Sequence, residues 1–259
     1  MKDIDILCVG EVLVDFIGHQ TGVLINNTRD YHRYLGGSPA NVAMNSARLG
    51  LKSVMVATVG NDGFGEYIFE RLNEVGVNTN HVKTIKNKPT SVIFVSRTDS
   101  TPDFIPFRKA DSYIREDQIS KELLSKSTIF HTTCFALSKK PAQTTILRKA
   151  EEAFNLGCKL SIDVNYAKKL WSSQDEALKV IKSYCKFNPL VKISEDDMLR
   201  LFEKKLSHKD IFNFFHSEGV DTVCLTLGSK GVILSEKGKK AIQLPAIKID
   251  VVQDATGAG

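Results

Sequence analysis

The segment Gly36-Gly37-Ser38-Pro39-Ala40-Asn41-Val42-Ala43 decides the fold, because it opens a helix that a buried strand soon follows. Ser38 is a typical helix N-cap, Pro39 suits the first helical turn, and Gly50 is typical of a helix end. The apolar run 53–59 comes directly after that end. A helix followed at once by an apolar strand predicts one unit of an alternating α/β fold.

The same alternation continues along the chain and predicts the fold class. Six apolar runs have strand length: 4–9, 53–59, 128–132, 159–163, 190–193 and 222–226. Six segments have helical periodicity: 38–49, 65–75, 142–156, 174–184, 196–203 and 208–218. Because the strand runs are apolar almost throughout, we expect an α/β fold with a mostly parallel sheet covered by helices on both faces.

Two stretches break this rhythm. Residues 15–34 and 91–108 alternate in the manner of exposed antiparallel strands, as in Ser91-Val92-Ile93-Phe94-Val95-Ser96-Arg97. We expect them to form a small β-sheet that projects from the main body as a lid. No Pro- or Ser-rich linker divides the chain, so we predict one domain over residues 1–259 with lid segments at about 15–34 and 91–108.

The composition excludes several classes of function. The 259 residues include 35 Lys and Arg against 30 Asp and Glu, and the resulting charge of +5 is spread along the chain. This favours a small anionic ligand over nucleic acid. No run reaches the roughly 18 apolar residues of a membrane helix, and no secretory signal is evident. The five cysteines form no CxxC pair, so we expect buried free thiols and a cytoplasmic protein.

Two glycine-rich segments indicate a ligand site. Gly36 and Gly37 would let a ligand approach the backbone near a helix N-terminus, and Asn41 offers a donor and an acceptor to sugar hydroxyls. The alternative is a tight turn into a helix. The segment Asp254-Ala255-Thr256-Gly257-Ala258-Gly259 could present successive N–H groups to an anion. Its alternative is a glycine-rich chain end without a ligand.

Together these segments resemble the two signatures of the PfkB (ribokinase-like) carbohydrate kinases. The resemblance covers the whole chain, including Gly10-Glu11, Asp15 and Gly60-Asn61-Asp62-Gly63-Phe64-Gly65. It implies a three-layer α/β/α fold and phosphorylation of a primary hydroxyl of a monosaccharide by ATP and Mg²⁺, with K⁺ as a further ion. Family members carry D-T-x-G-A-G-D in the tail, the last Asp being the catalytic base.

The tail of this chain departs from that pattern. Ala255 stands in the second place, and the sequence stops at Gly259, one residue before the expected base. We expect a longer parent chain. Without the acid–base group we expect turnover lower by roughly 10²–10⁴-fold.

The resemblance also assigns roles to individual residues. On the sugar side it implies Asp15, Gly36, Gly37, Asn41, Asn165 and Arg108, the last within Phe107-Arg108-Lys109-Ala110-Asp111. On the nucleotide side it implies Lys192, Ser194, Thr226, Gly228 and Gly231, with Gly257, Ala258 and Gly259 as an anion hole. For ions it implies Asp197 toward Mg²⁺ through water, and Asp254 and Thr256 toward a monovalent cation.

Some of these roles have a plainer alternative. Arg108 would look the same as a solvated arginine on an edge strand. The stretch from Lys192 to Asp197 would look the same as a helix start with a serine cap and early acidic residues. The turn from Thr226 to Gly231 would look the same as an ordinary hairpin.

The substrate prediction ranks fructose first. Ala167 stands where the segment Asp163-Val164-Asn165-Tyr166 should be followed by an arginine. In the 2-keto-3-deoxygluconate kinases of the family, that arginine is associated with the carboxylate of the substrate. Its absence places 2-keto-3-deoxygluconate second, and ribose, nucleosides and sugar phosphates rank lower. A non-catalytic sugar-binding protein is the alternative of another class. The exposed edges of the lid sheet suggest a homodimer. P-loop, α/β-hydrolase and dinucleotide-binding motifs are absent from the sequence.

Overall fold

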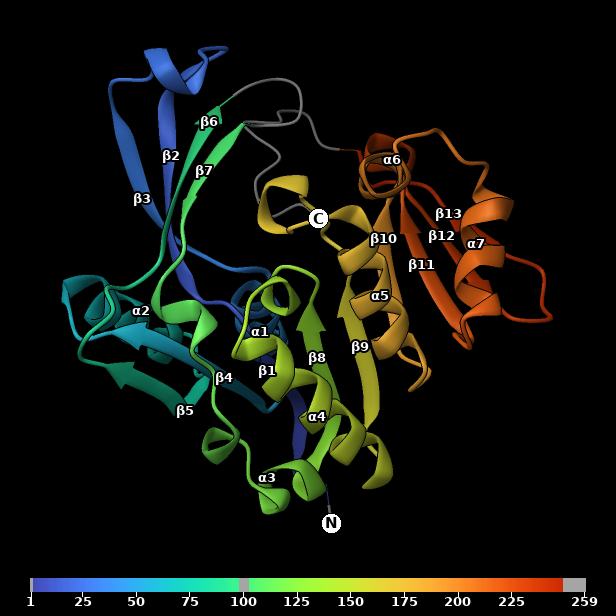
Figure 1. The fold of residues 1–259 in the computed structure, drawn as a ribbon, viewed down its shortest axis with the longest axis horizontal. Coiled ribbons are helices and arrows are strands. Elements are labelled where there is room, and N and C mark those ends of the chain that lie inside the picture. Colours follow the sequence, from blue (N-terminus) through green and yellow to red (C-terminus); the bar gives the residue numbers. More distant parts are fainter. Residues whose placement is uncertain (1, 98–102, 249–259) are drawn as a thin grey trace.

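A computed structural model describes residues 2–97 and 103–248 of the chain (Figure 1). The predictions for Asp254, Thr256 and Gly257 to Gly259 lie outside these residues. The described chain forms a large sheet with helices on both faces and a second, smaller sheet beyond one end of the large one (Figure 1).

The large sheet has the strand order β13-β12-β11-β10-β9-β8-β1-β4-β5. Its strands are β1 (Ile4–Val9), β4 (Ser53–Gly60), β5 (Asn78–Ile85), β8 (Ser127–Thr133), β9 (Lys159–Asp163), β10 (Leu190–Ser194), β11 (Thr222–Thr226), β12 (Val232–Glu236) and β13 (Ile242–Leu244). The pairs from β5 to β11 are parallel, and β12 and β13 add antiparallel pairs at one edge. The predicted mostly parallel sheet is confirmed.

Helices cover both faces of this sheet. Their bounds are α1 (Ser38–Arg48), α2 (Gly63–Glu74), α3 (Lys121–Lys126), α4 (Ala142–Asn155), α5 (Gln174–Cys185), α6 (Glu195–Phe202) and α7 (His208–Ser217). Alternate residues of β1 face opposite layers: Cys8 packs with α1 and α2, whereas Leu7 packs in the core that includes α4 and α5. The three-layer α/β/α architecture therefore follows from apolar strands that bury both faces.

The second sheet has the order β3-β2-β6-β7. It contains β2 (Leu13–Thr21), β3 (Tyr31–Gly36), β6 (Val92–Arg97) and β7 (Phe104–Phe107). One part of the prediction is wrong: β2 and β6 pair in parallel. The reason is connectivity, because the chain passes through α1, β4, α2 and β5 between them and returns in the same direction. The local alternation of apolar residues does not encode this direction.

The start of α1 also corrects a prediction. The N-cap is Gly37, and Ser38 lies inside the first turn, where its side chain makes no cap hydrogen bond. Its hydroxyl donates instead to Asp163 Oδ2 at 2.9 Å, and its amide donates to Glu11 Oε1 at 3.2 Å. The Glu11 carboxylate, which follows β1, thus accepts from the first amide of the helix, whereas Asp163 binds the Ser38 side chain. Gly50, with φ of 84°, follows the helix end as predicted.

The structure also bears on the predictions about the cysteines and about membrane-spanning helices. Four of the five cysteines are buried, Cys224 is partly buried, and all five are free thiols. None of the helices in the described part of the chain has the length and apolar character that a bilayer crossing requires.

Candidate functional site

The carboxyl ends of five parallel strands meet at one edge of the large sheet, below the second sheet (Figure 1). Polar residues stand at or just after these ends: Glu11 after β1, Thr133 on β8, Asp163 on β9, Ser194 on β10 and Thr226 on β11. Ligands of open α/β sheets bind at this kind of edge. The edge is therefore the candidate site.

Asp15 lies on β2 against Gly36. The two residues are so close that a Cβ on Gly36 would collide with the Asp15 carboxylate. No residue in 2–97 or 103–248 forms a hydrogen bond with this carboxylate. Burial raises the pKa of Asp15 to about 7. A partly buried acid without a partner has its acceptor oxygens available for a ligand that brings hydroxyl donors.

Gly37 and Asn41 lie on the turn and first helical residues that follow Gly36. Gly37 has φ of 105°, and a Cβ there would collide with the backbone carbonyl of Glu11. Both features require glycine. Asn41 is partly buried in the first turn, and its amide N–H donates to Gly37 O at 2.9 Å. The turn thus brings bare backbone next to Asp15 at Gly36, and Asn41 follows one helical turn further on.

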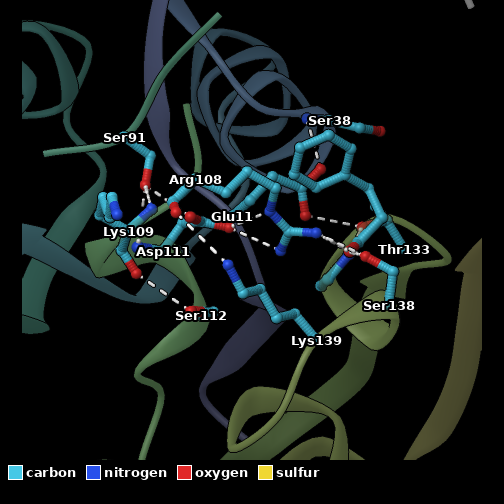
Figure 2. A network of polar contacts seen from close by, with 12 residues as sticks. Glu11, Ser38, Ser91, Arg108, Lys109, Asp111, Ser112, Thr133, Ser138 and Lys139 are labelled. Atoms are coloured by element: carbon cyan, nitrogen blue, oxygen red, sulfur yellow. Dashed lines mark hydrogen bonds and ion pairs between the residues drawn. The ribbon is translucent and has the colours of Figure 1, made fainter. Parts of the chain in front are cut away.

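Arg108 follows β7 and is buried, so the alternative of a solvated edge arginine is wrong. Only 7 % of the residue is exposed. Its Nε donates to Asp111 Oδ2 at 2.8 Å, and its Nη1 donates to the Phe135 carbonyl at 3.1 Å and to Ser138 Oγ. Figure 2 shows the guanidinium between the end of the second sheet and the segment that follows β8. The arginine joins the two parts of the molecule.

Replacing Arg108 should therefore be costly. Arg108→Met leaves Asp111, which is 2 % exposed, without its cation. Breaking a buried pair in this way costs about 3–5 kcal/mol. We expect a fall in melting temperature of roughly 10 °C, at 2–4 °C per kcal/mol for a chain of this size. Lys168→Met, which breaks the exposed pair with Glu203, is the control. Equal effects of the two variants in thermal denaturation would contradict this role.

Asn165 and Lys192 lie on the same edge. Asn165 Oδ1 accepts a hydrogen bond from the Phe135 amide at 3.1 Å. Lys192 Nζ lies 3.1 Å from Asp163 Oδ1. Because Asp163 also accepts from Ser38, one carboxylate connects the start of α1 with β10.

Ser194 and Asp197 form a capping box at the start of α6. The Asp197 amide donates to Ser194 Oγ at 3.0 Å, and Ser194 Oγ donates to Asp197 Oδ2 at 2.6 Å. Asp197 Oδ1 lies 2.6 Å from Arg200 Nη2. Burial raises the pKa of Asp197, against the effect of these partners. Both oxygens are engaged, so the carboxylate does not fit a direct Mg²⁺ ligand, and its contact through water stays a prediction. The capping role, which is the plainer interpretation of this segment, is observed.

The turn after β11 contains two glycines, and the structure favours glycine at each of them for a different reason. Thr226 ends the strand and is partly buried. Gly228 has φ of 57° and open space around its Cα. Gly231 has φ of 97°, and a Cβ there would collide with the Leu244 carbonyl of β13. Gly228 is thus favoured by its backbone conformation alone, whereas Gly231 is also required by the packing of the neighbouring strand.

Glu11 and Thr133 lie at the centre of the edge, although sequence reasoning assigned neither of them a separate role. Glu11 is 2 % exposed and accepts from Thr133 Oγ1 at 2.7 Å. Burial raises the pKa of Glu11 to about 8, against the effects of Thr133 and Arg108. The available signal was an acidic residue directly after a buried strand and a glycine.

Comparisons with known proteins identify the family of the chain. The model of the pfkB family of carbohydrate kinases matches residues 3–259. An ATP-dependent 6-phosphofructokinase of Thermoanaerobacterium thermosaccharolyticum is 34% identical over 100% of this chain and 79% of its own length. Probable fructokinase-5 of Arabidopsis thaliana is 30% identical over 98% of this chain and 79% of its own length. The chain therefore belongs to the pfkB family of carbohydrate kinases.

Solved structures show the same fold. The fructokinase of Halothermothrix orenii is 34% identical, with a TM-score of 0.87 over 94% of this chain and 86% of that one. A sugar kinase of Pyrococcus horikoshii, solved in complex with ATP, is 27% identical, with a TM-score of 0.81 over 95% of this chain and 78% of that one. The ribokinase-like fold predicted from the resemblance is confirmed.

Proposed function

We propose that this protein transfers a phosphoryl group from ATP to a primary hydroxyl of a monosaccharide, with fructose as the preferred acceptor. The observation that carries the proposal is the Asp15 carboxylate, which lies against Gly36 without a hydrogen bond to any described residue. A carboxylate in that position can accept from two sugar hydroxyls. Fructokinases among the relatives support fructose.

On the sugar side, Asp15 would accept hydroxyl hydrogens while Asn41 and Asn165 donate to hydroxyl oxygens. Gly36 and Gly37 would let the ring approach the backbone. Arg108, at the base of the second sheet, would contact the acceptor or the charge that develops on the transferred phosphoryl group. We propose that this sheet closes as a lid over the acceptor. Closure would exclude water, which otherwise competes for the phosphoryl group.

On the nucleotide side, ATP would lie along the carboxyl ends of β10 and β11. The proposed contacts are Lys192, Ser194, Thr226, Gly228 and Gly231. The amides of Gly257, Ala258 and Gly259 would stabilise charge on the transferred phosphoryl group. The aspartate expected after Gly259 would accept the hydroxyl proton. Mg²⁺ would arrive on the ATP phosphates, and Asp254 and Thr256 would hold K⁺.

A panel of acceptors tests this function. The full-length native polypeptide is assayed for ADP release with saturating MgATP. The acceptors are fructose, 2-keto-3-deoxygluconate, ribose and a nucleoside. We expect the highest kcat/KM with fructose. Turnover of another sugar without turnover of fructose would reject fructose. Sugar binding without ADP release would favour the non-catalytic alternative.

Fructose 6-phosphate is a second candidate acceptor, because a relative with 34% identity over the whole chain is a 6-phosphofructokinase. The same panel decides between the two, since only one of them carries a phosphate. A kcat/KM for fructose 6-phosphate above that for fructose would change the proposed substrate and leave the reaction class intact.

Lys192 tests the nucleotide side. We propose that its ammonium, held by Asp163, contacts the ATP phosphates. Lys192→Met should raise the KM for ATP about 10-fold or more, because a charge-assisted contact of roughly 1.5–3 kcal/mol is lost. Lys159→Met, on the exposed start of β9, is the control. An unchanged KM for ATP would remove Lys192 from the nucleotide site.

We also propose the setting in which the protein acts. It would work in the cytoplasm on small molecules, without a nucleic-acid or membrane partner, as a homodimer formed through the second sheet. Sedimentation of the native protein tests the dimer.

A further inference from the structure

The Glu11 side chain is a buried acid for which the proposed chemistry has no role. It comes directly after β1, at the edge where the strands end, and 2 % of the residue is exposed. Burying a carboxyl group is costly unless hydrogen bonds compensate for the lost water. The partners of Glu11 therefore indicate what the residue does.

Those partners lie on two different elements. Glu11 Oε1 accepts from the Ser38 amide at 3.2 Å, and Glu11 Oε2 accepts from Thr133 Oγ1 at 2.7 Å. Thr133 Oγ1 in turn accepts from the Ala136 amide at 3.0 Å. The carboxyl group thus connects the first residue of α1 to Thr133 at the end of β8, which lies 122 residues from Glu11 in the sequence.

The backbone of Glu11 shapes the same turn. Its carbonyl lies where a Cβ on Gly37 would stand. The Glu11 carbonyl thus leaves no room for a side chain at Gly37, and the Glu11 carboxyl binds the amide of the next residue, Ser38. No other described side chain accepts from the Ser38 amide.

Two charged groups near Glu11, Arg108 and Asp111, come from the segment that follows the second sheet. The Arg108 guanidinium lowers the pKa of the Glu11 carboxyl, while Asp111 and burial raise it. Figure 2 shows Glu11 between Arg108 and Asp111 on one side and Ser38 and Thr133 on the other. Glu11 therefore lies between the base of the second sheet and the glycine turn.

We propose that Glu11 is a positioning residue for sugar binding, holding the Gly36–Ser38 turn against the end of β8 so that the turn and Asp15 face the acceptor together. The inference rests on the proposed function, because it takes this turn to be the sugar contact. A turn that is already in its bound geometry spares the ligand the cost of ordering it.

Two variants and one control test this role. Glu11→Met keeps the approximate volume and removes both acceptors. In Glu11→Gln, Oε1 can accept from Ser38 and Nε2 can donate to Thr133 Oγ1. The control is Gln118→Met, which removes an equally buried, hydrogen-bonded side chain near β4. Fructose affinity is measured by calorimetry, melting temperature by calorimetric scanning, and amide exchange of residues 36–41 by mass spectrometry.

We expect Glu11→Met to weaken fructose binding about 10-fold, since the Ser38 amide is left without its acceptor and the turn is no longer fixed. Glu11→Gln should restore binding to within roughly 3-fold. Gln118→Met should lower the melting temperature and leave fructose affinity unchanged. Wild-type affinity in Glu11→Met, or an equal loss in Gln118→Met, would overturn the proposal.

The exchange measurement separates this inference from the proposed function. If the wild-type protein binds none of the sugars, the proposed function fails, and amide exchange still decides the role of Glu11. Faster exchange of residues 36–41 in Glu11→Met, with wild-type exchange in Gln118→Met, supports positioning of the turn. Unchanged exchange in Glu11→Met overturns it.

Discussion

Asp15→Asn is expected to abolish most sugar turnover while making the protein more stable above neutral pH. The amide is uncharged and has one acceptor oxygen where the carboxylate has two, and the loss of charge-assisted hydrogen bonds at the acceptor should lower kcat/KM by about 10²-fold or more. The gain in stability comes from the same burial that raises the pKa of Asp15 to about 7. An uncharged side chain does not suffer that desolvation.

The pH dependence follows from this pKa. Between about pH 4, the unfolded value for Asp, and about 7, the folded protein binds the Asp15 proton more tightly than the unfolded chain does. Stability therefore falls as the pH rises through this window, and the loss is complete above the folded pKa. Sugar affinity should change in the opposite direction, because the ionised form is the better acceptor.

Thermal scans and calorimetric titrations check both effects. At pH 8, Asp15→Asn should melt at least about 2 °C above the wild type, and the difference should vanish near pH 4. Fructose affinity of the wild type should weaken as the pH falls below 7. Asp3→Asn, at an exposed position, is the control. If Asp15→Asn binds and turns over fructose normally, Asp15 does not contact the sugar.

Gly37→Ala is the second substitution with a large expected effect. Alanine at φ of 105° is strained by about 1–2 kcal/mol, and its Cβ would collide with the Glu11 carbonyl. The turn must move to relieve that collision. We expect a lower melting temperature and a loss of fructose affinity of at least about 10-fold, since small misplacements of a binding group are costly.

Gly76→Ala separates the two causes. Gly76 has φ of 79° and no atom within 4 Å of the added Cβ, so it suffers the backbone strain without the collision. We expect Gly76→Ala to lose stability and to keep the fructose affinity of the wild type. Equal fructose affinity in Gly37→Ala and Gly76→Ala would contradict the close approach at the Gly36–Ser38 turn.

The fold was predictable because its central strands are apolar on both faces, as β4 is, with all eight residues buried. The strands that sequence reasoning missed lie at the edges of the sheet. β5 buries only Val82 among its eight residues, and β13 is exposed throughout, so neither has the continuous apolar run of a central strand. Helix α3 has only six residues, too few for a helical period to stand out.

The site was predictable where local sequence carries the constraint. Glycine is required at position 37 because φ there is positive. Asp15 and Gly36 belong to adjacent strands, so the second sheet brings them close together. The partners of Ser38 and Arg108 were not predictable, because Glu11, Asp163 and Phe135 reach them through the tertiary fold. Such contacts leave no periodic pattern. The direction of β6 against β2 is a further example, since a strand has the same local pattern in parallel and antiparallel pairs.

Direct observation of the transferred phosphoryl group tests the central claim. Phosphorus NMR follows MgATP and fructose with the full-length native polypeptide and with its Asp15→Asn variant. We predict a sugar-phosphate resonance that grows with ADP in the wild type and at least about 10²-fold more slowly in the variant. If the ATP spectrum stays unchanged while calorimetry shows bound fructose, the result would contradict phosphoryl transfer and indicate a sugar-binding protein.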